Sequence, residues 1–201
     1  MDMNCENNRV SLRGIMAGPP VFSHAGRGQE FYRFPLEVQR LSGAADTLNI
    51  ILRREQLDAV APREGDRLRV CGQLRSFNNR SGQGARLVIT VFARELWAEE
   101  GEDENRVQLR GTLCKEPKLR CTPMGRDICD LMLAVNRHYG RSDYLPCICW
   151  GKRARQAALW TPGTKLSLTG RVQSRGYIKM TDEGPQEKTA FEVSVMELEA
   201  P

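Results

Sequence analysis

Two aromatic residues, Tyr144 and Trp150, lie six positions apart in a segment that alternates in hydrophobicity. Side chains an even number of positions apart in a strand share a face, so both rings are expected opposite Cys147 and Cys149. Exposed aromatic rings can stack on the bases of a single-stranded nucleic acid, and each contributes about 1 to 3 kcal/mol with little sequence preference. Packing of both rings in the core is the alternative, although the adjacent Lys152 favours solvent exposure.

Basic side chains accompany these rings in the same half of the chain. A basic groove interleaved with aromatic rings is the pattern expected of a protein that binds single strands. Each of these cations alone could equally be an ordinary solvated charge, so the prediction depends on the whole set. The candidates for phosphate contacts are Arg110, Arg120, Arg137, Arg141, Lys152, Arg171, Arg175 and Lys179.

Metal binding and catalysis have less support. The seven cysteines are dispersed, and no two of them show the two-residue gap typical of a zinc site. Neither of the two histidines, His24 and His138, has a plausible nucleophile or metal partner beside it, and no glycine loop that cradles phosphate is present. We therefore expect reduced thiols, no metal, no cofactor, no catalytic residue and no enzymatic activity.

Composition and hydropathy predict a soluble globular protein. The chain is 40% hydrophobic and 27% charged, and its mean hydropathy is -0.48. Its polar start, which contains Asp2 and Glu6, lacks the basic and apolar regions of a signal peptide. We therefore expect a cytoplasmic protein with no membrane partner.

The sequence contains an internal repeat. Residues 8–14 recur as residues 105–111 with six identities in seven, and residues 65–72 match residues 163–170. Two matches in the same order, at offsets of 97 and 98 residues, indicate that one unit has been duplicated. The repeat predicts two domains of similar structure.

An acidic segment separates the two copies. Residues 98–104 carry five like charges in seven positions, which oppose compact packing and predict a linker between domains at 1–97 and 105–201. The formal net charge is +4 for residues 1–97, -5 for the linker and +6 for residues 105–201. Two basic domains suggest a polyanionic partner, and a solvated charged face is the alternative.

Both copies share one order of expected elements. Alternating apolar residues predict three strands, a helix-compatible stretch follows, and two further strands close each copy. The two helical stretches cover residues 55–61 and 153–160, and the closing strands cover residues 68–74, 87–92, 166–172 and 191–195. This order predicts an all-β protein of two tandem five-stranded OB-fold barrels, each with one short helix, and a generic β-sandwich is the alternative. Glycines at equivalent strand positions, Gly14, Gly72, Gly111 and Gly170, predict the corners of the barrels.

Residues 105–199 resemble the bacterial single-stranded DNA-binding protein (SSB) family along nearly their whole length. The matching blocks are residues 105–111, 116–120, 122–125, 133–137, 150–154, 170–175 and 189–197. Residues 8–97 resemble the family only through the duplication. The resemblance implies a protein that binds and protects single-stranded DNA in replication, recombination or repair, with RNA left open. The alternative is an OB-fold module for protein interaction or primosome assembly that binds nucleic acid weakly.

The resemblance also extends the set of stacking residues. It implies that Tyr139, in the loop after the second strand, and Tyr177, in the loop between the last strands, join Tyr144 and Trp150. The first copy departs from this pattern, because Thr47 and Arg53 stand at the positions of Tyr144 and Trp150. We therefore expect a degenerate site in the first copy. Its weaker candidates are Arg53, Phe77 and Tyr32, and packing roles are expected for Trp97 and Trp160.

The resemblance further implies an assembly and a location. Family members with two barrels per chain generally act as dimers, so we expect a homodimer, and a monomer is the alternative. Typical members continue past the barrel into a tail with an acidic tip that recruits replication and repair enzymes. This sequence stops at residues 197–201, so we expect no such recruitment. The expected location is the bacterial cytoplasm, in association with the nucleoid.

Overall fold

The computed structural model describes residues 7–79, 86–137, 140–181 and 184–200. Contacts divide the chain into two units, which we call the first unit (residues 9–75 and 89–106) and the second unit (residues 1–8, 76–88 and 107–201). This division differs from the predicted boundaries, because residues 76–88 are grouped with the second unit and the whole of the predicted linker with the first. The helices that the structure describes are all too short or too polar to span a membrane.

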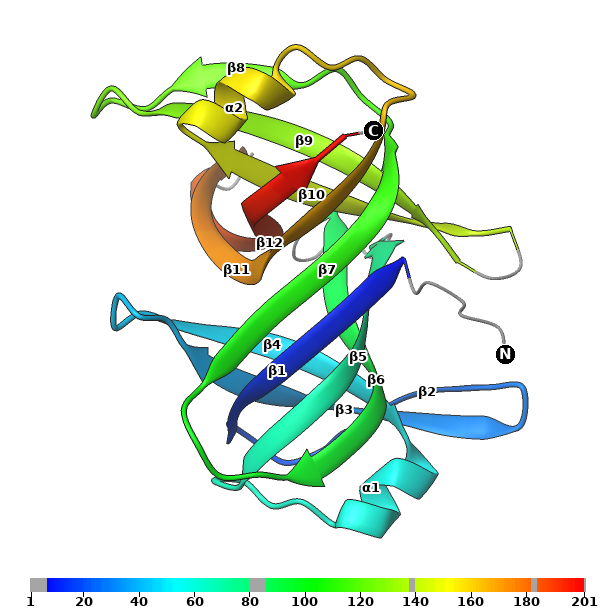
Figure 1. The fold of residues 1–201 in the computed structure, drawn as a ribbon. Helices are drawn as coiled ribbons and strands as arrows, with labels where there is room; N and C mark the ends of the chain where they lie inside the picture. Colours follow the sequence, from blue (N-terminus) through cyan, green and yellow to red (C-terminus); the bar gives the residue numbers. More distant parts are fainter. Residues whose placement is uncertain (1–6, 80–85, 138–139, 182–183, 201) are drawn as a thin grey trace. The chain divides into compact units, whose positions relative to one another are not determined.

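The first unit is built from six strands and one short helix (Figure 1). They are β1 (Asn8–Met16), β2 (Val21–Gly26), β3 (Gln29–Gln39), β4 (Ala45–Arg53), α1 (Arg54–Val60), β5 (Arg67–Asn78) and β6 (Leu87–Ala98). The strands follow the order β2-β3-β4-β6-β5-β1, and an additional pairing of β3 with β1 closes the barrel. The β4–β6 pairing is parallel, whereas β3 pairs antiparallel with both β2 and β4.

The second unit repeats this architecture. It contains β7 (Glu104–Leu113), β8 (Lys118–Cys121), β9 (Asp127–Asn136), β10 (Ser142–Trp150), α2 (Lys152–Ala157), β11 (Lys165–Thr181) and β12 (Gly184–Glu199). The strand order is β7-β11-β12-β10-β9-β8, closed by a pairing of β7 with β9. Because corresponding elements follow the same order in both units, the duplication read from the sequence is also a duplication of structure.

The predicted series of three strands, one helix and two strands is present in each unit, with three differences. Strands β2 and β8 were not predicted; neither contains a buried residue, so neither shows the alternation that marks a half-buried strand. Helix α2 ends at Ala157, three residues before the predicted end. The last two strands also extend far beyond the predicted residues.

The two cores consist of alternate residues from corresponding strands, as predicted. Val10, Leu12, Phe34, Leu36 and Val38 are buried in the first unit, and Val107, Leu109, Leu131, Leu133 and Val135 are buried in the second. This inward set leaves the residues between them on the outer face of each barrel.

The predicted corner glycines lie where another strand approaches closely. Strand β1 pairs with β5 as far as Ile15 and with β3 at Ile15 and Met16, so Gly14 directly precedes the change of partner. A Cβ atom at Gly14 would lie 2.2 Å from the carbonyl oxygen of Glu37. Glycine is therefore required there because a neighbouring backbone occupies the space of a side chain.

The predicted linker packs against the strands of the first unit, because arginines of that unit neutralise its negative charges. Glu99 forms ion pairs with Arg13 at 3.3 Å and with Arg69 at 2.9 Å. Asp103 pairs with Arg67 and also accepts a hydrogen bond from the backbone N–H of Gln39 at 2.6 Å. Glu104 pairs with Arg69 at 2.6 Å. The acidic segment is thus held against the first unit and offsets part of that unit's positive charge.

Candidate functional site

Strand β10 presents Tyr144 and Trp150 on the surface of the second unit. The two side chains are 51% and 39% exposed, whereas Cys147 and Cys149 on the same strand are buried. The predicted division of the strand into a ring face and a thiol face is therefore observed. Ile148 has the same parity as the rings and is nevertheless buried, so the outer face is not exposed along its whole length. The rings are available to an external ligand.

Strand β8 adds a cation to the same face. Trp150 lies opposite Ile128 of β9, which in turn lies opposite Arg120 of β8, and residues directly opposite each other project from the same side of a sheet. Arg120 donates two hydrogen bonds to Asp130, at 2.7 and 3.0 Å, and these raise the pKa of its guanidinium. Asp130 therefore holds Arg120 as a cation on the ring face and offsets part of its charge.

Two further predicted cations flank the rings along the chain. Arg141 immediately precedes β10, and Lys152 is the first residue of α2, two positions after Trp150. Both are exposed. Their positions at the two ends of the strand are suited to contacts with a backbone that passes over both rings.

Arg137, in contrast, is only partly exposed and is engaged in a hydrogen-bond network. Its guanidinium forms two hydrogen bonds to the fully buried carboxylate of Asp143, one of them at 2.7 Å from Nε, and donates a third to the carbonyl of Ser76 at 3.2 Å. Ser76 in turn donates its backbone N–H to Asp143 at 2.6 Å, and its Oγ accepts the backbone N–H of Tyr144 at 2.7 Å. A phosphate contact by Arg137 would compete with this network, which supports the strand that carries Tyr144.

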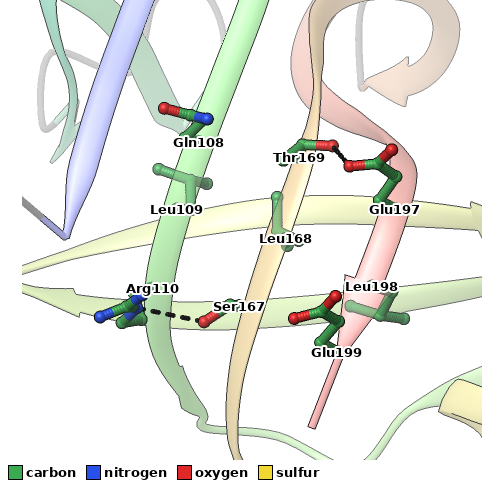
Figure 2. A pocket seen from close by; sticks show the side chains of 9 residues that line it. All are labelled: Gln108, Leu109, Arg110, Ser167, Leu168, Thr169, Glu197, Leu198 and Glu199. Carbon is green, nitrogen blue, oxygen red and sulfur yellow. Dashed lines mark hydrogen bonds between the residues drawn. The ribbon is translucent and has the colours of Figure 1, made fainter.

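Arg110 lies on β7 and not on β10, the strand that carries the two rings; Figure 2 shows its surroundings. It lines a pocket formed by β7, β11 and β12, where its Nε donates a hydrogen bond to Ser167 Oγ at 3.2 Å. Glu197 and Glu199 line the same pocket. Two carboxylates disfavour a phosphate in this pocket, so the structure gives Arg110 little support as a phosphate contact.

The β11–β12 hairpin carries three other candidates. Tyr177 is half-buried and lies opposite Lys188. Arg175 is exposed and pairs at 3.3 Å with Glu192, and Arg171 has a buried Nε without a hydrogen-bond partner among the described residues. Tyr139 and the side chain of Lys179 lie outside the part of the chain that the structure describes.

The first unit holds two of the weaker candidates, Arg53 and Tyr32, and the third, Phe77, belongs to the segment grouped with the second unit. Arg53 and Thr47 are exposed on β4, and Phe77 is 53% exposed on β5. Tyr32 is half-buried on β3, with its ring in edge contact with Phe22 at 5.9 Å. The sequence analysis did not identify a group of three rings in the first unit, formed by His24, Phe31 and Phe92. No alternation in one segment marks them, because they come together from three strands.

The thiols do not form a metal site among the described residues, where no group of three or more potential ligands is found. Burial raises the pKa of Cys149 to about 12 and also raises that of Cys147. Both thiols are therefore held in the protonated form at neutral pH.

Comparison with known proteins gives a consistent result. Residues 104–200 match the model of the Single-strand binding protein family. Single-stranded DNA-binding protein B of Bacillus subtilis is 38% identical over 80 residues, which cover 36% of this chain and 71% of that protein. A single-stranded DNA-binding protein of Clostridium tetani is 36% identical over 80 residues, which cover 36% of this chain and 55% of the relative.

A relative from another organism is matched over about the same share of its length as the protein from Clostridium tetani. Single-stranded DNA-binding protein 2 of Listeria innocua is 39% identical over 80 residues, covering 36% of this chain and 50% of the relative. This chain thus spans only about half the length of the relatives from Clostridium tetani and Listeria innocua.

A solved structure extends the comparison to both units. The wild-type single-stranded DNA binding protein from Thermus aquaticus aligns with a TM-score of 0.78 at 24% identity, over 96% of this chain and 92% of that one. At this identity the likeness concerns the fold, and together with the strand order it confirms the predicted all-β fold of two tandem OB-fold barrels. The family match and the relative from Bacillus subtilis show that the chain belongs to the single-strand binding protein family.

Proposed function

We propose that this protein binds and protects single-stranded DNA with weak sequence preference, in replication, recombination or repair. The observation that carries the proposal is the exposure of Tyr144 and Trp150 on one face of β10. Arg120, on the same face, and Lys152 add positive charge beside the rings. The protein would act in the cytoplasm and by binding alone, without a catalytic step.

Stacking and charge pairing account for this activity without recognition of sequence. Every base has a π-face that can stack on Tyr144 or Trp150, and every nucleotide supplies a phosphate for an exposed cation such as Arg141. Because binding releases counterions from the strand, affinity should fall with salt along a log-log slope of about -0.7 per neutralised phosphate.

The second unit is expected to supply most of the affinity. The corresponding strand of the first unit, β4, carries Thr47 and Arg53 in place of the two rings. An arginine plane can stack on a base, so Arg53 is a plausible but weaker contact. Tyr177, Tyr139 and Lys179 remain candidates for further contacts in the second unit.

Removal of both rings tests the proposal. The variant Tyr144→Ala/Trp150→Ala should lose about 2 to 6 kcal/mol of binding free energy for a fluorescein-labelled oligothymidine, as measured by fluorescence anisotropy. Arg53→Ala is the matched control at the corresponding position of the first unit, and it should cost less. Circular dichroism must show that both variants keep the β-fold.

Two outcomes would contradict the proposal. Binding of duplex DNA as tightly as single-stranded DNA at the same salt concentration would exclude a preference for single strands. Unchanged Trp150 fluorescence on addition of an oligonucleotide would favour a module for protein interaction, since a stacked base quenches the indole.

A further inference from the structure

We propose that the first unit has its own stacking platform for single-stranded nucleic acid, centred on Phe31 of β3 rather than on a residue of β4. The inference depends on the proposed function, because it identifies a second contact surface for the same class of ligand. None of the aromatic positions that the family resemblance implies corresponds to Phe31.

The platform is a row of three rings from β2, β3 and β6. The imidazole of His24 on β2 stacks on the ring of Phe31, with centroids 4.7 Å apart and planes inclined by 11°. The ring of Phe92 on β6 lies 6.0 Å from Phe31 at an angle of 47°, and the guanidinium of Arg75 on β5 lies 5.9 Å from the Phe92 centroid. The row thus joins π-faces with a cation, the two groups that bind single strands.

The register of the strands relates this platform to that of the second unit. Phe31 lies directly opposite Arg53 in the β3–β4 pairing, and Ile128 lies directly opposite Trp150 in the corresponding β9–β10 pairing. The aromatic member of the pair has therefore exchanged strands between the two copies. Since opposite residues have Cβ atoms about 4.5 to 5.5 Å apart on one face, the exchange keeps a ring at nearly the same place on the barrel.

The surrounding charges favour a polyanion over an apolar protein surface. Arg53 shares the face of Phe31 as its direct partner, and Arg33 shares it as the residue two positions further along β3. Both arginines are exposed, as is His24, while Phe31 and Phe92 are half-buried. Exposed guanidinium groups beside partly open rings fit the phosphates and bases of one strand.

A variant series in the full chain isolates this platform. Tyr144→Ala/Trp150→Ala serves as the background, because removal of the exposed rings of β10 leaves the first unit intact. Addition of Phe31→Leu retains an apolar side chain but removes the ring, and should weaken residual binding to fluorescein-labelled oligothymidine by about 5-fold or more. Trp97→Leu, which removes another exposed ring of the same unit, is the matched control and should leave the affinity of the background unchanged.

The outcomes separate this inference from the proposed function. If the unmodified chain does not bind the oligonucleotide, the proposed function fails. If the unmodified chain binds and Phe31→Leu has no effect in the background, or no more than Trp97→Leu, the platform is refuted and Phe31 has only a packing role. If circular dichroism shows that Phe31→Leu does not fold, His24→Ala tests the same stack at an exposed position. It should also weaken binding, and an unchanged affinity would refute the platform.

Discussion

The two copies retain some residue pairs and have changed others, and the difference separates structural positions from those proposed to bind a strand. Arg40 and Asp46 in the first unit correspond to Arg137 and Asp143 in the second, and in each pair the guanidinium bonds to a fully buried carboxylate. The ring positions on β4 and β10, in contrast, differ. A pair that persists while the rings change is explained by burial of its carboxylate, which would be unstable without a partner.

Arg137→Met should therefore destabilise the second unit. The change leaves the buried Asp143 without its guanidinium, at a cost of about 3 kcal/mol, and lowers the midpoint of urea unfolding followed by circular dichroism. Arg141→Gln, at an exposed position nearby, should change stability by no more than about 0.5 kcal/mol. Equal midpoints for the two variants would show that Arg137 is dispensable for folding and free to serve a ligand.

The cysteines of the second unit should differ sharply in reactivity. Cys121 is exposed, whereas Cys147 and Cys149 are buried and burial raises the pKa of both thiols. Because the thiolate is the reactive form, iodoacetamide should label Cys121 in the native protein and the other two only in denaturant. Peptide mass spectrometry measures this directly. Native labelling of Cys147 as fast as that of Cys121 would contradict the observed burial.

Individual elements depend on contacts that their own sequence does not reveal. The acidic segment after β6 has a composition typical of a solvated linker, yet its carboxylates Glu99, Asp103 and Glu104 pair with three arginines, Arg13, Arg67 and Arg69. The four corner glycines, Gly14, Gly72, Gly111 and Gly170, are likewise explained by the close backbone of a neighbouring strand. In both cases the conformation of the segment depends on the residues that pack against it.

The linker contacts should weaken in acid. Burial alone would raise the pKa of Glu104, but hydrogen bonds from Arg69 and Ser11 outweigh it and lower the pKa from the usual 4.5. A carboxylate with a lowered pKa in the folded state stabilises the protein above its ordinary pKa, and this contribution disappears as pH falls through the lowered value. Glu104→Gln should therefore lower the thermal midpoint at pH 7, and its difference from the unmodified chain should vanish in stronger acid. A difference that is independent of pH would exclude this ionic role.

Substitution of Gly72 should disturb the pairing of β5 with β6. A Cβ atom at Gly72 would lie 2.1 Å from the carbonyl oxygen of Phe92, so Gly72→Ala forces two strands apart at a cost of about 1 to 3 kcal/mol. Gly176→Ala is the matched control, because no atom lies within 4 Å of its Cβ position. Urea unfolding should therefore separate the two variants, and equal stability would refute the close approach.

The whole chain combines two copies of one barrel with different surface chemistry. Tyr144 and Trp150 of the second unit lie on β10, whereas the grouped rings of the first unit come from β2, β3 and β6. The acidic segment also offsets part of the first unit's charge. This asymmetry supports unequal contributions of the two copies to the proposed activity.

We expect the chain to form a homodimer. Small barrels leave strand edges uncovered, and a symmetric contact between identical chains buries them without a second gene product. Gel filtration with light scattering should give twice the chain mass of 22.7 kDa at micromolar concentrations. A mass of one chain throughout that range would establish the monomer instead.

The sequence by itself determined the duplication, the order of the principal strands and the shared face of Tyr144 and Trp150. These features are local or repetitive: alternation with period two is visible within one strand, and a repeat needs only comparison of the chain with itself. The short strands β2 and β8 escaped prediction because they bury nothing.

Only the tertiary structure decided which of the candidate side chains already form hydrogen bonds within the protein, and which rings lie in contact with one another. The bond of Arg137 to Asp143 and the stack of His24 on Phe31 each depend on the register between strands. Register is set by the packing of the whole barrel, and a shift of one residue would move every side chain to the other face. For that reason the shared exposed face of Tyr144 and Trp150 could be predicted from β10 alone, whereas the row of rings in the first unit could not.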